Sequence, residues 1–227
     1  MLKPSRSLAV IAGAWICAVA GLLPAGDGSS QRDLDTAIAG IQNRYAGVES
    51  IRADFRQSYR GPAIDRTESG SMEMKRPNLM HWEYRVPEAK VFVADGRDTY
   101  LYTPEDRQVL VRRYSADDLR GTPLQIFLGR DDIRKSFEVA WETAQQPLIQ
   151  GAILLRLIPR GDSAEYAYTV IECDQGSYDV RRVMIRERTG NTSEFVFSNV
   201  QTNVKIDSRQ FQFKIPKGVE VVRVDEK

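Results

Sequence analysis

The pattern of apolar and polar positions first indicates a helix over residues 31–46. Ser30, followed three residues later by Asp33, is typical of a helix start, because both side chains can accept hydrogen bonds from free backbone amides. Five apolar residues then recur at the spacing of one helix face: Leu34, Ile38, Ile41, Tyr45 and Val48. The sequence therefore predicts one amphipathic helix near the start of the folded chain.

After Gly47 the apolar residues alternate with polar ones, which is typical of β-strands with one buried face. In residues 51–60, for example, Ile51, Ala53 and Phe55 alternate with charged residues. Similar segments follow at short intervals, with turn residues between them. They lie near residues 67–75, 79–86, 90–94, 98–103, 108–114, 137–142, 152–159, 166–174, 179–188, 192–201, 211–216 and 218–224. We expect ten or eleven antiparallel strands.

Residues 115–135 interrupt the strand pattern. Thr122 is a suitable cap and Pro123 occupies a helix-start position. Three apolar residues would share one helix face: Leu124, Phe127 and Leu128. Because so large a sheet curls to protect its edges, we expect an α+β, mainly β fold. It would be a single incomplete antiparallel barrel whose open mouth is covered by the N-terminal helix and the short helices.

A cluster of large, adaptable side chains surrounds the corner at Lys75-Arg76-Pro77. Proline is confined to strand starts, edges and turns, so Pro77 marks a corner between two strands. Side chains two residues apart point to the same face. One face of these strands would therefore carry Met72, Met74, Met80, Trp82, Tyr84 and Val86. These residues could form an ordinary core or line a pocket for an apolar ligand.

The first 26 residues resemble a secretory signal peptide. Lys3 and Arg6 precede an apolar run over residues 8–23, and small residues follow it. We expect cleavage between residues 20 and 28, which leaves residues 27–227 as one secreted domain. The run is short for a membrane span. Lipidation at Cys17 is not expected, because Trp15 and Ile16 are not the small residues that such a signal needs.

Charge and cysteine content limit the possible partners and stabilising bonds. Removing Lys3 and Arg6 takes the 32 basic residues to 30, against 31 acidic residues. Without a basic block of useful length, nucleic acid is not an expected partner. Only Cys173 remains after cleavage, so no internal disulfide can form, and its alternating context favours a buried position.

Candidate chemistry is sparse along the chain. The sole histidine, His81, has no accompanying nucleophile motif. One histidine and one distant cysteine do not form a metal site. The acidic pair Asp131-Asp132 precedes a possible helix, where negative charge favours the helix dipole. We therefore expect no enzymatic activity, no metal and no cofactor.

The corner and the residues around it resemble one known family, the periplasmic outer-membrane lipoprotein carrier proteins of Gram-negative bacteria. The resemblance covers most of the chain after the signal peptide. It rests on the order and spacing of Phe55, Gln57, Gly70, Lys75-Arg76-Pro77, Trp82, Asp95-Gly96, Tyr102, Pro104, Thr122-Pro123, Leu157, Pro159, Gly190-Asn191-Thr192, Phe195, Phe197, Asn203, Phe211, Phe213, Pro216, Gly218 and Val219.

The resemblance implies a carrier that holds acyl chains of lipoproteins in an apolar cavity beneath a helical lid. It implies three partners: acylated lipoproteins, an inner-membrane transporter that releases them and an outer-membrane lipoprotein that accepts them. Arg76 would hold the lid closed, and we expect a monomer. We expect the Arg76 guanidinium to donate hydrogen bonds to carbonyl groups of residues 31–46 or 115–135. The expected cavity residues are Phe55, Met72, Met74, Met80, Trp82 and Tyr84, and those of the lid face are Leu34, Ile38, Ile41, Leu124, Phe127 and Leu128.

One position departs from the family pattern, and several alternatives stay open. Met80 stands where the family commonly has an aromatic residue, which puts the details of lid contact in doubt. The same fold would suit the lipid-anchored acceptor of the pathway, or a periplasmic carrier or sensor of another lipid. An enzyme of envelope lipid metabolism and a module that binds extended segments at a sheet edge are further alternatives.

Overall fold

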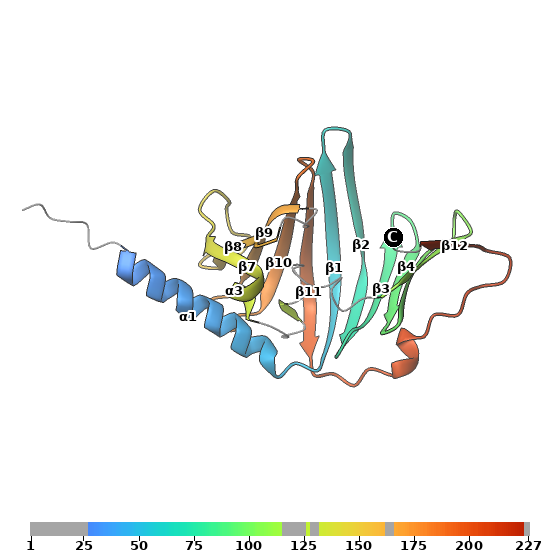
Figure 1. The fold of residues 1–227 in the computed structure, drawn as a ribbon, viewed down its shortest axis with the longest axis horizontal. Helices are drawn as coiled ribbons and strands as arrows, with labels where there is room; N and C mark the ends of the chain where they lie inside the picture. The colour runs from blue at the N-terminus through green and yellow to red at the C-terminus, as the bar shows by residue number, and fades with distance from the viewer. Residues whose placement is uncertain (1–26, 115–125, 128–131, 162–165, 225–227) are drawn as a thin grey trace, which may run out of the picture.

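The computed structural model describes residues 27–114, 126–127, 132–161 and 166–224, with side chains from residue 33 onward. One long helix, α1 (Asp27–Ala46), precedes the strands, and α3 (Ile133–Ser136) and the 3-10 helix η2 (Ser208–Phe211) are short (Figure 1). The strands are β1 (Ser50–Gly61), β2 (Ile64–Lys75), β3 (Leu79–Val86), β4 (Lys90–Asp95), β5 (Asp98–Thr103), β6 (Gln108–Arg113), β7 (Phe137–Trp141), β8 (Ile153–Pro159), β9 (Tyr166–Cys173), β10 (Val180–Glu187), β11 (Thr192–Thr202) and β12 (Glu220–Val224).

In the described part of the chain these strands form one open sheet. Their order is β12-β6-β5-β4-β3-β2-β1-β11-β10-β9-β8-β7, so β12 and β7 lie at the two edges. All neighbours are antiparallel except β12, which pairs with β6 in parallel. The expected mainly β, incomplete barrel-like sheet is confirmed. The structure corrects two expectations: the described residues form twelve strands instead of ten or eleven, and one pair of strands is parallel instead of antiparallel.

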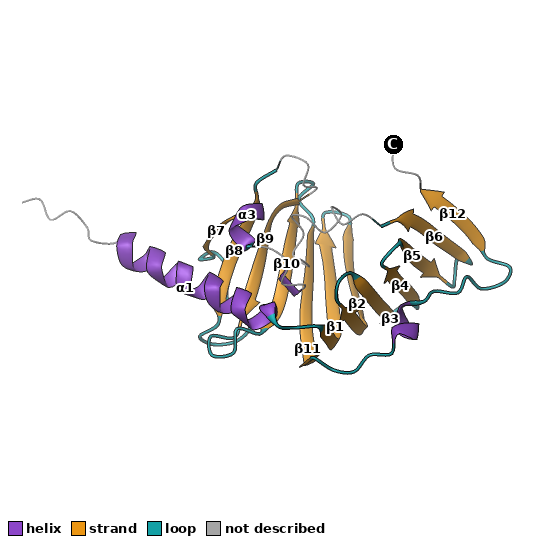
Figure 2. Cartoon of the chain, turned by 60° about the horizontal axis from the view of Figure 1, so that its bottom comes forward, coloured by secondary structure: helices purple, strands orange, loops and turns teal. Residues whose placement is uncertain are grey.

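Helix α1 crosses one side of the curved sheet, which we call the inner face; the other side is the outer face (Figures 1 and 2). Its apolar stripe is buried against the strands, as the helical spacing predicts. The buried residues of this stripe are Leu34, Ala37, Ile38, Ile41 and Tyr45. The helix begins at Asp27, earlier than the expected residue 31.

The segment before β12 covers part of the outer face instead of pairing as a strand. Residues 211–216 are expected as a strand, but Phe211 ends η2 and residues 212–216 follow it without pairing. Phe211 is buried, and the ring of Phe213 lies 5.3 Å from that of Tyr100 and 5.9 Å from that of Tyr102. The alternating apolar residues of this segment pack on the outside of β5, which local alternation alone does not distinguish from strand pairing.

A buried ion pair lies on the outer face of β9 and β10. The Glu172 carboxylate and the Arg182 guanidinium are 2.8 Å apart, and their side chains are 0% and 6% exposed. Glu172 Oε1 also accepts hydrogen bonds from the amides of Leu148 (2.7 Å) and Ile149 (2.9 Å). The segment between β7 and β8 is thereby held against the sheet.

Candidate functional site

The six residues that the sequence predicts to line a cavity lie together on the inner face of β1, β2 and β3. The register aligns them in rows, because Met72 pairs with Trp82 and Met74 pairs with Met80. Five of the six are buried and Tyr84 is half-buried; the set is Phe55, Met72, Met74, Met80, Trp82 and Tyr84. In this conformation they pack against one another, so their role as the lining of an opened cavity stays a prediction.

Aromatic rings form the middle of this surface. The ring centroid of Phe55 lies 5.0 Å from that of Trp82 and 4.9 Å from that of Tyr84. Gly70, which pairs with both Phe55 and Tyr84, has no side chain between them. A Cβ atom there would lie 1.9 Å from the carbonyl oxygen of Glu83, so only glycine fits. Tilted and edge-to-face rings at these distances stabilise the packing beyond the area they bury.

The predicted lid residues that the structure describes are buried in the same core as this surface. Leu34, Ile38 and Ile41 of α1 belong to the same core. Phe127 connects α1 to the sheet, because its ring lies 5.5 Å from that of Tyr45 and 5.4 Å from that of Phe197. The other two predicted lid residues, Leu124 and Leu128, lie outside the described residues.

Arg76 follows β2 and points toward the end of α1. Its Nη2 donates a hydrogen bond of 2.8 Å to the carbonyl of Tyr45, and its Nη1 lies 3.8 Å from the Glu49 carboxylate. Carbonyl groups in the last turn of a helix have no partner within the helix, and a cation is favourable there. Lys75 points the other way, and its Nζ donates to Ser208 Oγ at 3.3 Å.

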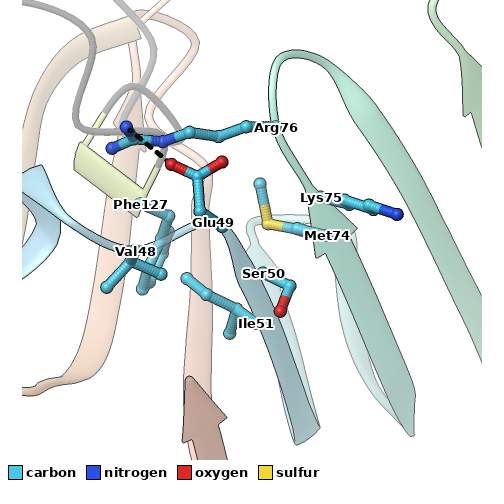
Figure 3. Close-up of a pocket in the computed structure, with 8 residues that line it drawn as sticks. All are labelled: Val48, Glu49, Ser50, Ile51, Met74, Lys75, Arg76 and Phe127. Atoms are coloured by element: carbon cyan, nitrogen blue, oxygen red, sulfur yellow. Dashed lines mark ion pairs between the residues drawn. The ribbon is translucent and has the colours of Figure 1, made fainter. Parts of the chain in front are cut away.

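A small hollow lies beside Arg76, below the end of α1 (Figure 3). It encloses about 160 Å³, counting the part open to solvent, but it is too narrow to admit a water molecule. An acyl chain could therefore enter only if the surrounding side chains moved apart. The lining residues are Val48, Glu49, Ser50, Ile51, Met74, Lys75, Arg76 and Phe127.

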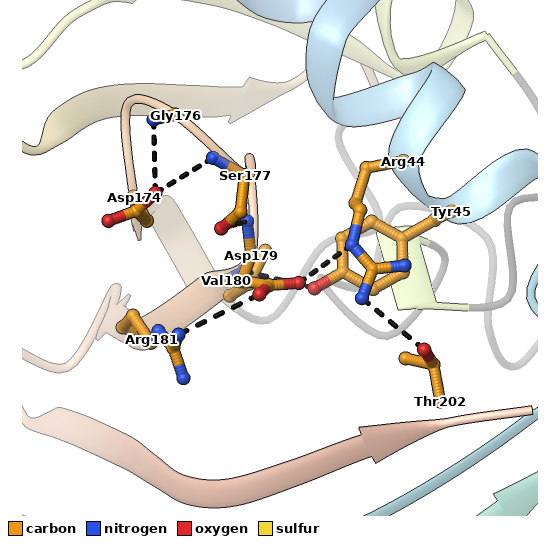
Figure 4. A network of polar contacts seen from close by, with 9 residues as sticks. All are labelled: Arg44, Tyr45, Asp174, Gly176, Ser177, Asp179, Val180, Arg181 and Thr202. Carbon is orange, nitrogen blue, oxygen red and sulfur yellow. Dashed lines mark hydrogen bonds and ion pairs between the residues drawn. The ribbon is translucent and has the colours of Figure 1, made fainter. Parts of the chain in front are cut away.

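Three polar contacts attach the last turn of α1 to the end of β11 and to the start of β10 (Figure 4). These strands lie on the other side of β1 from the Arg76 corner. Arg44 Nε donates to Asp179 at 2.7 Å, and Arg44 Nη2 donates to Thr202 Oγ1 at 3.4 Å. The Tyr45 hydroxyl accepts from the amide of Val180 at 2.9 Å. Burial raises the pKa of Tyr45 well above its ordinary value, so the hydroxyl stays protonated at neutral pH.

Two of the candidate chemical groups, Cys173 and Asp132, lie at structural positions in the part of the chain that the structure describes. Cys173 is buried, and burial raises the pKa of its thiol far above neutrality, which keeps it in the unreactive protonated form. Asp132 accepts a hydrogen bond from the amide of Arg134 and caps α3, as the sequence predicts. The described residues contain no group of three metal-binding side chains. Within the same residues, no helix combines the length and the apolar character needed to cross a membrane.

Residues 46–214 match the family described as outer membrane lipoprotein carrier protein LolA. The chain belongs to this family. The match contains all of β1 to β11, the corner at Arg76 and the aromatic residues of the inner face. The family match covers most of the chain. The apolar inner face, on the side of the sheet where α1 lies, is therefore the candidate functional site.

Similar proteins agree with this assignment. The outer-membrane lipoprotein carrier protein of Bordetella avium is 31% identical over 182 residues, which cover 79% of this chain and 83% of that protein. The protein of the same name from Bordetella pertussis is 28% identical over 98% of both chains. An uncharacterized conserved protein from Thermus thermophilus superposes with a TM-score of 0.52 and 11% identity, over 85% of this chain and 99% of that one. That likeness shows the fold alone.

Sequence reasoning did not assign two features of the site. Phe195 and Phe197 complete the aromatic surface, since Phe195 lies 5.7 Å from Trp82 and Phe197 contacts Phe127. Their spacing of two residues in an alternating segment is the signal that places them on one face. The second feature is which carbonyl accepts from Arg76: the sequence predicts an acceptor in residues 31–46 or 115–135, and Tyr45 supplies it. Side-chain patterns do not distinguish one backbone acceptor from its neighbours.

Proposed function

We propose that this protein carries lipoproteins to the outer membrane by holding their acyl chains on its inner face. One observation carries the proposal: in a member of the carrier family, methionine and aromatic side chains of β1, β2 and β3 form a continuous apolar surface that belongs to the same core as the buried stripe of α1. Methionine has a flexible, polarizable side chain, so such a surface adapts to acyl chains of different lengths. The relatives from Bordetella are named as carriers of this kind.

Binding would exchange protein contacts for lipid contacts. Displacing α1 from the sheet would expose Leu34, Ile38 and Ile41, which are now buried. Exposing one such side chain to water costs about 1.5–3 kcal/mol, and burying one methylene of an acyl chain contributes about 0.8 kcal/mol. Burying about three methylenes of the lipid therefore offsets the exposure of one side chain. A lipid with two or three acyl chains can therefore offset the loss without covalent chemistry.

Arg76 would couple this exchange to the conformation of the protein. Moving α1 from the corner breaks the hydrogen bond from Arg76 to the Tyr45 carbonyl. A bound state would be favoured only if the acyl chains compensate for this bond and for the lost apolar contacts. Arg76 would thus favour the closed form until a lipid is available.

The proposed cycle takes place in the periplasm after removal of residues 1–26. An inner-membrane transporter would load the carrier with an acylated lipoprotein, and an outer-membrane lipoprotein would accept the cargo. The carrier would work as a monomer without a cofactor or a catalysed reaction. Met80, in place of an aromatic residue, keeps apolar bulk at the surface and allows a more flexible contact with the lid.

The test is to express the full chain in a Gram-negative host, purify it from the periplasm and identify bound molecules by mass spectrometry. We expect an intact mass for a chain cut between residues 20 and 28, together with acylated lipoproteins that dissociate on denaturation. Another lipid as the main ligand would favour a carrier or sensor of that lipid. A diacylated cysteine at the new N-terminus would favour the acceptor of the pathway.

A further inference from the structure

The inner face changes from apolar to polar along the length of its strands. On β1, Ile51, Ala53 and Phe55 are at most 3% exposed, whereas Gln57 and Tyr59 at the far end are half-buried. The neighbouring strands show the same change in the same direction. On β2, Met74 and Met72 give way to Glu68 and Arg66, and on β3, Met80 and Trp82 give way to the hydroxyl of Tyr84.

Polar side chains from five strands meet where this change occurs. We call Gln57, Glu68, Tyr84, Lys90 and Ser193 the polar belt. The Tyr84 hydroxyl donates to Gln57 Oε1 at 3.1 Å, and Gln57 Nε2 donates to Ser193 Oγ at 3.0 Å. Lys90 Nζ donates to both carboxylate oxygens of Glu68, at 2.8 and 2.7 Å. The belt therefore crosses the inner face from β4 to β11.

The polar belt directly adjoins the apolar surface. The ring of Tyr84 lies 4.9 Å from that of Phe55, and Lys90 Nζ lies 4.2 Å from the centroid of the Tyr84 ring. The side chains of Glu68 and Lys90 are only 8% and 23% exposed. Charged groups are rarely enclosed to this degree without a role or a firm set of partners. Arg66, 2.7 Å from Glu68, gives that carboxylate a second cation.

We propose that the polar belt binds the glyceryl ester and amide groups at the acylated end of a lipoprotein. The acyl chains then extend along the inner face toward Met74 and Met80, and the polypeptide leaves past Tyr59. This assignment rests on the carrier function proposed above and adds the orientation of the cargo. Ester and amide carbonyls are acceptors, and Lys90 Nζ and Gln57 Nε2 each have one N–H group left after the bonds within the belt.

The orientation follows from the cost of burying polar groups. With its head at the methionine end, the lipid would place its carbonyl oxygens among thioether and aliphatic groups, and an unsatisfied buried acceptor costs about 1–3 kcal/mol. Arg76 is the competing donor at that end, with one of its five N–H groups bonded to the Tyr45 carbonyl, so a head at Arg76 is the alternative that photo-crosslinking distinguishes from the belt. Burial raises the pKa of Tyr84 well above its ordinary value, so this group in the belt remains a donor.

Photo-crosslinking tests the orientation directly. The probes are two synthetic triacylated lipopeptides, one with a diazirine at the end of an acyl chain and the other with it on the residue after the acylated cysteine. We expect the acyl diazirine to label peptides that contain Met72–Met80 and the peptide diazirine to label those that contain Gln57, Glu68 or Lys90. The reverse pattern, with the head at Arg76, would overturn the proposed orientation while leaving the carrier function in place. Failure of both lipopeptides to bind would refute the carrier function itself.

A double variant and a control variant test whether the belt residues bind the ligand, without disrupting the fold. Gln57→Leu combined with Lys90→Met leaves Glu68 paired with Arg66, so the sheet should still form. We expect about a tenfold weaker affinity for the lipopeptide, and no change for a long-chain alkane that has no carbonyl group. Arg60→Met is the matched control, because its ion pair with Asp65 is exposed on the outer face. Equal lipopeptide affinities for the double variant and the control would overturn the role of the belt.

Discussion

Arg76 and Tyr45 connect the corner between β2 and β3 to the last turn of α1 through a single hydrogen bond of 2.8 Å. The same turn is bonded to the other half of the sheet, because the Tyr45 hydroxyl accepts from Val180 and Arg44 pairs with Asp179 (Figure 4). The end of α1 therefore bridges the β2–β3 corner and the start of β10, which β1 and β11 separate in the sheet. Releasing the Arg76 side alone would leave the helix attached at Asp179 and Val180.

We therefore expect Arg76→Leu to impair lipoprotein transfer while leaving the fold intact. The substitution removes the donor to Tyr45, and the ion pair with Glu49 that it also removes is exposed and contributes little. The measurement is the amount of lipoprotein taken from inner-membrane vesicles and passed to the acceptor, at matched concentrations of folded protein.

Lys75→Leu is the control for Arg76→Leu. Lys75 belongs to the same corner, but its Nζ bonds to Ser208 on the opposite side. Transfer by this variant should be close to that of the unmodified protein. If Arg76→Leu also transfers normally, Arg76 is a structural residue of the corner and does not hold the lid.

The close packing of the Tyr178 ring against Gly40 of α1 predicts that a larger residue at position 40 destabilises the protein. A Cβ atom at Gly40 would lie 2.3 Å from the Tyr178 ring, so Gly40→Ala forces the helix or the ring to move. Overpacking costs about 1–3 kcal/mol, against roughly 1 kcal/mol gained in helix propensity. We expect a net loss of stability in urea unfolding.

Gly47→Ala provides the comparison, because no atom lies within 4 Å of a Cβ at that position. Stability should be unchanged or slightly higher. Replacing Tyr178 with glycine in the Gly40→Ala background should recover part of the loss, since Tyr178 has a φ of 58° that glycine adopts easily. No recovery would mean that the ring is not the obstacle.

The inner face was predictable because its signals are local. Alternation placed Met72, Met74, Met80 and Trp82 on one face, and Pro77 separated their two strands, as observed. Val86 was grouped with them but is 57% exposed, because a register shift lies where β2 pairs with the end of β3.

The C-terminal part was less predictable because its partners are distant in sequence. Residues 220–224 form β12, but its parallel pairing with β6 depends on a long connection that residue patterns do not specify. Phe211 and Phe213 alternate as in a strand, yet they cover the outer face. Alternation predicts which side chains share a face and does not predict what that face contacts.

The buried pair on the outer face predicts strong destabilisation by Arg182→Met. This change leaves Glu172 buried without its cation, and breaking such a pair typically costs about 3–5 kcal/mol. In the double variant with Glu172→Gln the uncompensated charge is gone, and the glutamine oxygen can still accept from Leu148 and Ile149. Urea unfolding should therefore show the double variant to be more stable than Arg182→Met. A double variant that is equally unstable would contradict the charge explanation.

Glu142 predicts a specific dependence of stability on pH. Burial alone would raise the pKa of this carboxyl, but hydrogen bonds from Arg156 and the Ala144 amide outweigh burial and lower the pKa below its ordinary value. A group with a lowered pKa in the folded state stabilises the fold above its unfolded pKa of about 4.3, and this contribution is lost as the pH falls through the folded pKa. We expect Glu142→Gln to be less stable than the unmodified protein at pH 7. This difference in free energy of unfolding should be constant from pH 7 to about pH 5 and should shrink below about pH 4.

Glu105→Gln, at an exposed turn, is the control and should show little difference from the unmodified protein at any pH. A Glu142→Gln effect that stays the same down to pH 3 would show that the carboxylate charge is not its source.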